Sequence, residues 1–168
     1  MMTLSRTDFV LTEAGTYFAT HTHGCDVAKL TVLLYLLDLE HFRQTGRTAT
    51  TAQYIARPDG PFIPGLVELL TQPDPRAAAF LRLDRGLGLG RPLVKSTRQF
   101  STMDITSRHL HILSDLAARY ADSFAEEIVA QALRTAPAYQ ALLVGPGERP
   151  ISFSFVATDR ARYSEMVA

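Results

Sequence analysis

The chain has 168 residues, and its 17 basic and 17 acidic side chains give a formal net charge of zero at pH 7. Apolar residues make up 46% of the sequence, the ordinary share for a globular chain, and the length is that of one domain able to bury a sizeable core. The charge balance argues against nucleic-acid binding as the main function, because proteins that bind phosphate backbones carry clustered Lys and Arg side chains.

The single cysteine and the N-terminal segment bear on location. Cys25 cannot form an internal disulfide, and an isolated thiol is typical of a reducing compartment. The first residues are too polar for a signal peptide, and no apolar stretch is a convincing membrane span. We therefore expect one cytoplasmic domain over residues 1–168, with no membrane contact.

Residues 7–20 predict a first helix, and the link that follows it contains His21, His23 and Cys25. These are side chains of the types that bind zinc, but a zinc site usually takes four ligands. No second cluster supplies the remaining ligands at a recognised spacing. His109 and His111 are two positions apart on a later predicted helix, so at most one of them faces the core. We expect no metal and no cofactor.

The most hydrophobic segment of the chain lies between Asp26 and Gly46. It predicts a helix with Asp26 as N-cap, because a carboxylate there accepts hydrogen bonds from the free N–H groups of the first turn. Gly46 suits the position after the helix, where the chain turns with a positive φ. Leucines occupy nearly every face, so the helix is expected to be buried and the rest of the chain to pack around it.

Polar residues interrupt the second half of this central helix. Asp38 and His41 are three positions apart and share a face, and Arg43 and Arg47 follow near the helix end. One interpretation is a functional polar cluster. The other, which we favour, is a charge network that fixes the following turn, because structural ion networks imitate sites.

The middle of the chain predicts short strands and one short helix. Residues 53–57 favour a strand, and the turn at 58–61 follows from a proline that fixes φ and a glycine that closes the turn. A short helix is expected over residues 63–70. Partial alternation at 80–83 and 92–95, on either side of a glycine-rich connection, predicts two more strands. We expect these to form one antiparallel sheet with the strand at 53–57.

The C-terminal part predicts three further helices. A capping box at 101–104 opens one that continues to about Ala121, and a second capping box at 122–126 opens the next. A third short helix ends near Leu143. Alternation at 151–155 predicts a terminal strand, and the tail from 158 to 168 is expected to be loosely held.

The predicted fold class is therefore α+β, mainly α: a helical domain around a central buried helix, with a small antiparallel β-sheet.

Several of these pieces follow one another in a recognisable order. They are Lys29-Leu30, Leu33-Leu34-Tyr35, Asp38, His41, Thr45-Gly46-Arg47, Tyr54, Pro58, Gly60-Pro61 and Pro64-Gly65-Leu66. This order and spacing resemble the Panacea domain, the SocA-like antitoxin family. The agreement is best over residues 29–70, within a matching core of 26–143. The family often has Leu-Ser-His and Pro-Ala-Trp near the end of the penultimate helix, whereas this chain has Leu133-Arg134 and Pro137-Ala138-Tyr139.

The resemblance implies an antitoxin and not an enzyme. Such a protein neutralises a cognate toxin, encoded by a neighbouring gene, by direct protein–protein binding, and can also hand the toxin to a protease. The motif residues that the resemblance singles out are Tyr35, Asp38, His41, Arg47, Tyr54, Arg57, Pro58, Gly60 and Pro61. For Tyr35, Gly60 and Pro61 we favour a structural role. Arg47, Tyr54 and Arg57 are better candidates for surface contact, because Arg and Tyr are enriched in interface hot spots.

Two other functions stay open. One is a DNA-binding regulator with a winged-helix-like module, whose best helix, residues 106–119, carries only Arg108 and Arg119 as basic residues besides histidine. It predicts a saturable shift of duplex DNA at low salt, where phosphate contacts are strongest. The other, less favoured, is a metal or thiol enzyme built around His21, His23 and Cys25.

Overall fold

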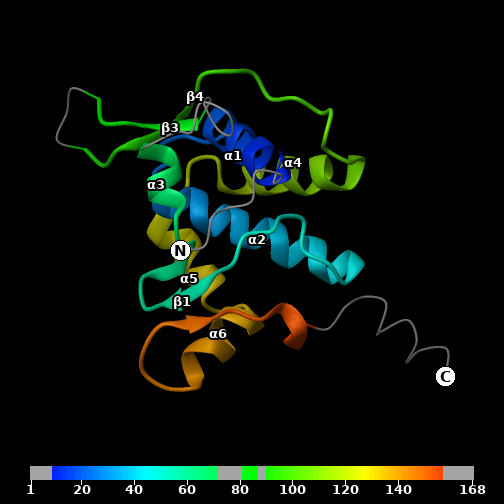
Figure 1. The fold of residues 1–168 in the computed structure, drawn as a ribbon, viewed down its shortest axis with the longest axis vertical. Coiled ribbons are helices and arrows are strands. Elements are labelled where there is room, and N and C mark those ends of the chain that lie inside the picture. The colour runs from blue at the N-terminus through cyan, green and yellow to red at the C-terminus, as the bar shows by residue number, and fades with distance from the viewer. Residues whose placement is uncertain (1–8, 72–80, 87–89, 157–168) are drawn as a thin grey trace.

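A computed structural model describes residues 9–71, 81–86 and 90–156 (Figure 1). In this part of the chain six helices accompany two small antiparallel sheets, of three and two strands. The predicted fold class, mainly α with a small antiparallel sheet, is confirmed. The expected helix start at residues 7 and 8 and the expected loose tail at 158–168 lie outside the described residues. None of the described helices is long and apolar enough to cross a membrane.

The central helix is α2, Val27–Thr45, and both of its predicted ends are confirmed. The carboxylate of Asp26 accepts a hydrogen bond from the Lys29 backbone N–H at 2.7 Å. Gly46 adopts a left-handed conformation with φ of 76°, and its N–H donates to the Phe42 carbonyl at 2.7 Å. Every residue of α2 from Lys29 to Leu39 is buried, as expected for a helix that is apolar on nearly all faces.

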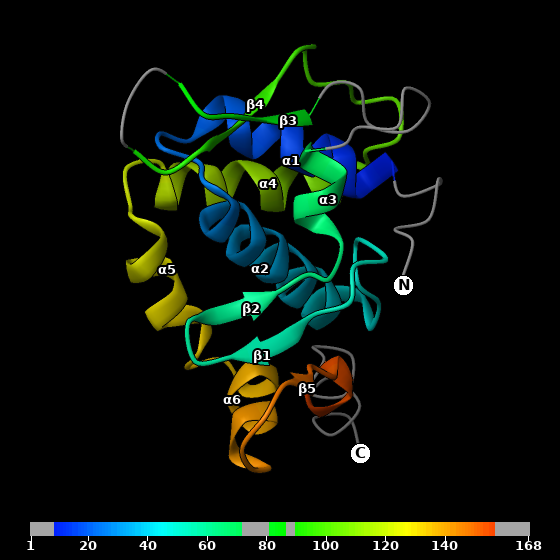
Figure 2. The same cartoon turned by 60° about the vertical axis from the view of Figure 1, so that its left-hand side comes forward.

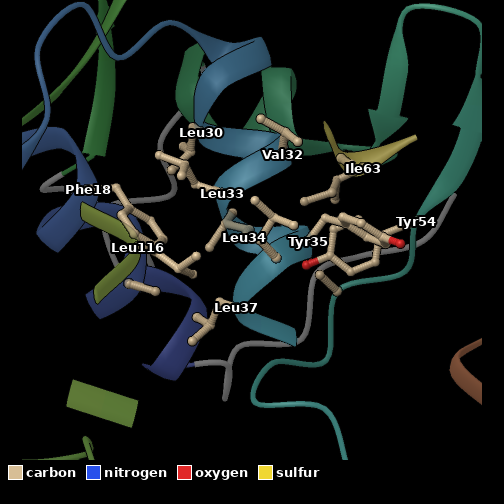
Figure 3. Close-up of a cluster of buried hydrophobic side chains, with 14 of the residues drawn as sticks. Phe18, Leu30, Val32, Leu33, Leu34, Tyr35, Leu37, Tyr54, Ile63 and Leu116 are labelled. Atoms are coloured by element: carbon tan, nitrogen blue, oxygen red, sulfur yellow. The ribbon is translucent and has the colours of Figure 1, made fainter. Parts of the chain in front are cut away.

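Two layers pack on opposite sides of α2. Helices α1, Phe9–His21, and α4, Ser107–Tyr120, lie on one side, while α5, Ala125–Ala132, and α6, Ala136–Leu143, lie toward the other (Figure 2). Figure 3 shows the resulting core: Phe18 and Leu116 approach α2 from one side, and Tyr54 and Ile63 from the other. One helix therefore supplies the core of both layers.

The strands form two separate sheets, so the expectation of one shared sheet is wrong. β1, Ile55–Arg57, pairs with β2, Gly60–Phe62, on one edge and with β5, Arg149–Pro150, on the other. Both edges of β1 are thus occupied. β3, Leu81–Asp84, and β4, Leu93–Ser96, pair with each other in a separate two-stranded sheet, with Leu81 opposite Ser96 and Asp84 opposite Leu93. The pairing of the two strands on either side of the glycine-rich connection was predicted correctly. Their expected pairing with the strand at 53–57 was not.

Three predicted element boundaries are also corrected. The expected strand at 151–155 is absent: Arg149–Pro150 forms β5, and Phe153–Phe155 forms a single 3-10 turn, η1. α4 begins at Ser107 and not at Ser101, whose backbone N–H donates instead to the buried carboxylate of Glu13 at 2.9 Å. α5 is capped one residue later than expected, since the Phe124 N–H donates to the Glu127 carboxylate at 2.8 Å.

The short helix α3, Leu66–Thr71, follows the β1–β2 hairpin, with Leu66 and Leu70 buried. It packs against β3. α2, the hairpin and α3 therefore form a continuous unit, and the β3–β4 hairpin lies beside it.

Candidate functional site

Asp38 lies in the core, at the centre of a hydrogen-bond network. One carboxylate oxygen accepts from the Thr50 N–H at 2.7 Å, and the other accepts from the Thr50 and Tyr54 hydroxyls at 2.6 Å each. Burial raises the pKa of Asp38 to about 6, although the hydrogen bonds from Thr50 and Tyr54 oppose the rise. The network fastens the loop after α2 to the helix.

Tyr35 continues this network toward α6. Its hydroxyl is hydrogen-bonded to the Thr135 hydroxyl and accepts from the Ala138 N–H at 3.3 Å. Its ring meets the Tyr54 ring edge to face, with 5.6 Å between the centroids. Both tyrosines are buried, so the expectation that Tyr54 contacts a partner at the surface is wrong. The buried, hydrogen-bonded position of Tyr35 is in line with the structural role that we favoured for it.

His41 contacts a different part of the segment after α2 than Asp38 does. Its Nδ1 lies 2.7 Å from the Arg47 carbonyl oxygen, and its ring lies beside that of His109, with 4.8 Å between the centroids. Burial lowers the pKa of His109, and the neighbouring His41 and Arg108 add to the effect. The side chain of Arg47 is exposed. Asp38 and His41 thus fix two parts of the segment after α2, in line with the network interpretation.

The β1–β2 hairpin accounts for the remaining motif residues. The Arg57 guanidinium lies 3.6 Å from the centroid of the Phe62 ring and forms an ion pair with Glu148. Gly60 has φ of 125°, and a Cβ atom there would lie 2.9 Å from a methyl carbon of Val129. Pro61 is buried and Pro58 is exposed. Arg57 therefore has partners inside the chain, while Gly60 permits close contact with α5.

The link before α2 does not assemble a metal or thiol centre in the described chain. His21 Nδ1 lies 2.9 Å from the Tyr17 carbonyl oxygen, and His23 Nδ1 lies 2.6 Å from the Asp122 carboxylate. Burial raises the pKa of the Cys25 thiol to about 11, so at neutral pH the thiolate is scarce. Among the described residues, no three His, Cys, Asp or Glu side chains come together in a way that could hold a metal ion.

An apolar groove of about 670 Å³ lies near the motif. Its walls come from the first turn of α2, from α3, from the β3–β4 hairpin and from α5, with Asp59 of the β1–β2 turn at its edge. The apolar residues that line it are Val27, Ala28, Val67, Leu83, Pro92, Ala125, Val129, Ala130 and Leu133. The groove therefore lies where α2, α3 and the two hairpins meet α5.

Sequence reasoning missed this groove, and none of the predicted motif residues lines it. The available signal was in α5 and its C-cap residue, because Val129, Ala130 and Leu133 are apolar in addition to the residues that α5 buries in the core. A helix of that kind buries one face in its own core and leaves another for a partner. The five segments that form the groove are separate in the sequence and share no residue pattern that would predict that they meet.

A smaller cavity of about 280 Å³ lies between α2, α4 and α5. Its charged side chains are already paired with each other, Arg43 with Glu40 at 3.7 Å and Arg119 with Asp115 at 2.6 Å. The apolar groove is the stronger candidate site.

No family model, curated protein or solved structure matches this chain. The resemblance to the Panacea domain rests on the ordered residues of the motif, and membership in that family stays a prediction.

Proposed function

We propose that this chain is a SocA-like antitoxin of the Panacea type, which neutralises a cognate toxin by binding it directly through the apolar groove. The groove is the observation that carries the proposal, because it is concave and lined mainly by apolar side chains, which is the usual form of a binding site on a folded domain. The protein then works in the cytoplasm, beside the toxin made by the same cell, and a buried thiol with no disulfide partner is compatible with that compartment.

The motif residues support this proposal through the scaffold that they build. Asp38 and Tyr35 hold the loop and α6 against α2, and Gly60 lets the hairpin close on α5. These contacts fix α5 and the β1–β2 hairpin relative to α2, and all three contribute to the groove. The family resemblance and the groove are therefore linked: Tyr35, Asp38 and Gly60 of the motif are buried, and the surface that they help to shape is free to differ with the toxin.

The two other functions have less support. Arg108 of α4 donates to the Gln44 side chain at 2.8 Å, and Arg119 pairs with Asp115, so the best DNA-reading helix directs its arginines to neighbours within the chain. The raised pKa of Cys25 works against a nucleophilic thiol. No observation favours either function over protein binding.

Co-expression with the product of the neighbouring gene tests the proposal. We expect the neighbour alone to arrest growth, and this chain to restore growth and to co-purify with it. A Leu34→Asp variant, which places an unpaired charge in the core, should fail to rescue. A harmless neighbour, or rescue without a complex, would reject neutralisation by binding. Faster loss of the toxin when both proteins are made would add delivery to a protease as a second step.

A further inference from the structure

The groove runs along α5 and has small residues at positions that a partner would approach. In Figure 2, α5 lies between the β3–β4 hairpin above and the β1–β2 turn below. Ala28 and Ala130 are exposed within it, and Ala125 lies at the start of α5. α5 has eight residues and is therefore about 12 Å long, roughly two helical turns. Alanines at such positions let the backbone of another helix come close.

Three of the four charged side chains that line the groove are carboxylates. At the start of α5, two of them share one guanidinium: Arg91 pairs with Asp26 at 3.3 Å and with Glu126 at 2.6 Å. At the other end, Asp59 is exposed in the β1–β2 turn. It takes part in no ion pair with any residue that the structure describes. An occupant would therefore meet an apolar centre between two acidic ends.

We infer that the groove takes an amphipathic helix of the partner, with an apolar face flanked by Lys or Arg side chains. This rests on the proposed function, since the partner is then the toxin. Helix-in-groove recognition uses apolar anchors at helical spacing. Acidic ends favour basic flanks, because complementary charge at the rim speeds encounter and rejects the wrong partners.

An added strand suits this groove less well than a helix, because the edge of β4 is already bonded to the segment before α2. The Val94 N–H of β4 donates to the Cys25 carbonyl at 2.7 Å, and Leu93 bridges to Asp26. β2 packs against α2 and α5, and α3 packs against β3. Main-chain pairing at β4 would need these bonds to open, whereas a helix needs only side-chain contact.

Two synthetic peptides test the inference on the full chain. Both carry leucines at helical spacing and a fluorescent label, and they differ only in having Lys or Glu beside the apolar face. We expect the Lys peptide to give a saturable rise in anisotropy and to bind at least about tenfold more tightly than the Glu peptide, or about 1.4 kcal/mol. Equal binding of the two peptides would overturn the basic-flank assignment.

Matched variants locate the binding. Ala130→Trp fills the groove and should weaken the Lys peptide by about tenfold or more, as expected at the centre of an interface, whereas Ala118→Trp, on an exposed position of α4 outside the groove, should not. Asp59→Lys should weaken it by roughly two- to fivefold and reduce its salt dependence. The control for that charge reversal is Asp104→Lys, at an exposed position outside the groove. An unchanged affinity of the Lys peptide for Ala130→Trp would show that the groove is not the binding site.

If melting shows that Ala130→Trp does not fold, Asp59→Lys decides the question, because Asp59 is an exposed turn residue. The same variants in the growth assay separate the two proposals. If wild type and Ala130→Trp neutralise the neighbouring gene product equally, the antitoxin proposal stands and the groove inference fails. If the neighbouring gene product is harmless while the groove variants still weaken binding of the Lys peptide, the groove inference stands and the toxin proposal fails.

Discussion

At the scale of single residues, Asp38 is a carboxylate kept in the core by hydrogen bonds from Ala49, Thr50 and Tyr54. Its pKa of about 6 in the folded chain exceeds the usual 3.8, because burial disfavours the charged form more than Thr50 and Tyr54 favour it. Between these two values the folded state holds a proton that the unfolded state has lost. The free energy of unfolding therefore falls as the pH rises from about 4 to 6.

Asp38→Asn isolates this contribution, because an amide keeps much of the shape and does not titrate. We expect the stability of the wild type relative to Asp38→Asn to drop by about 2 kcal/mol between pH 4 and pH 7, since a shift of one pKa unit corresponds to about 1.36 kcal/mol and part of the effect lies below pH 4. Urea unfolding at both values measures it. Asp104→Asn, at an exposed site, should show no comparable change. Parallel pH profiles for wild type and Asp38→Asn would show that the carboxyl group is not desolvated.

The residues that could be predicted from the sequence are those whose role is local. Asp26 and Gly46 cap α2 through contacts within four positions along the chain, and both were identified from residue type alone. Tyr54 was misjudged as a surface residue, because its burial depends on Asp38 and Tyr35, which lie far from it along the chain. Residue preference gives no information about such distant partners.

At the scale of elements, the β1–β2 hairpin is held against α5 by a contact that only glycine permits. Gly60 combines φ of 125° with a space closed by Val129. Gly60→Ala should destabilise the fold by about 2–4 kcal/mol, through backbone strain of about 1–3 kcal/mol plus overpacking. Adding Val129→Ala should recover the overpacking part and leave the strain. Thermal unfolding of the single and double variants measures both.

Gly147→Ala is the control for the strain alone. Gly147 has φ of 111°, and a Cβ atom added there would have no atom of the described residues within 4 Å. A Gly60→Ala variant no less stable than Gly147→Ala would mean that the hairpin does not press on α5.

Element pairing was the part of the fold that the sequence could not decide. Each strand of the two sheets is short, with four residues at most, and a short strand carries little information about its partner. The start of α4 was missed for a related reason: Thr106 and His109 cap it reciprocally, at 3.2 and 3.3 Å, and histidine is not the usual third residue of a capping box.

At the scale of the whole molecule, α2 makes the described chain one packing unit. It contacts α1 and α4 on one side and α5 and β2 on the other, so neither layer has a core without it. The groove is a product of the same arrangement, because α2, α3, α5 and the two hairpins meet only when both layers are in place. Because five segments contribute to the groove, the sequence of a single segment does not predict it.

Leu34→Ala tests this shared core, because Leu34 is fully buried in the middle of α2. Removing a leucine side chain from a packed core costs about 2–5 kcal/mol, so we expect a large loss of stability. The loss should occur in one transition, since both layers lose the same support. Far-UV circular dichroism follows the helices. Tyrosine fluorescence follows side-chain packing in both layers, through Tyr17 and Tyr120 on one side and Tyr35 and Tyr54 on the other, in a chain that has no tryptophan.

Leu143→Ala supplies the comparison, because that leucine is 62% exposed at the end of α6 and its loss should change stability by no more than about 0.5 kcal/mol. If the two signals of Leu34→Ala separated into two midpoints, the layers would have independent cores. The groove between them would then open with the weaker layer, and binding of a partner helix would be coupled to folding of that layer. A single midpoint means instead that the groove persists for as long as the chain is folded, which is what a preformed binding surface requires.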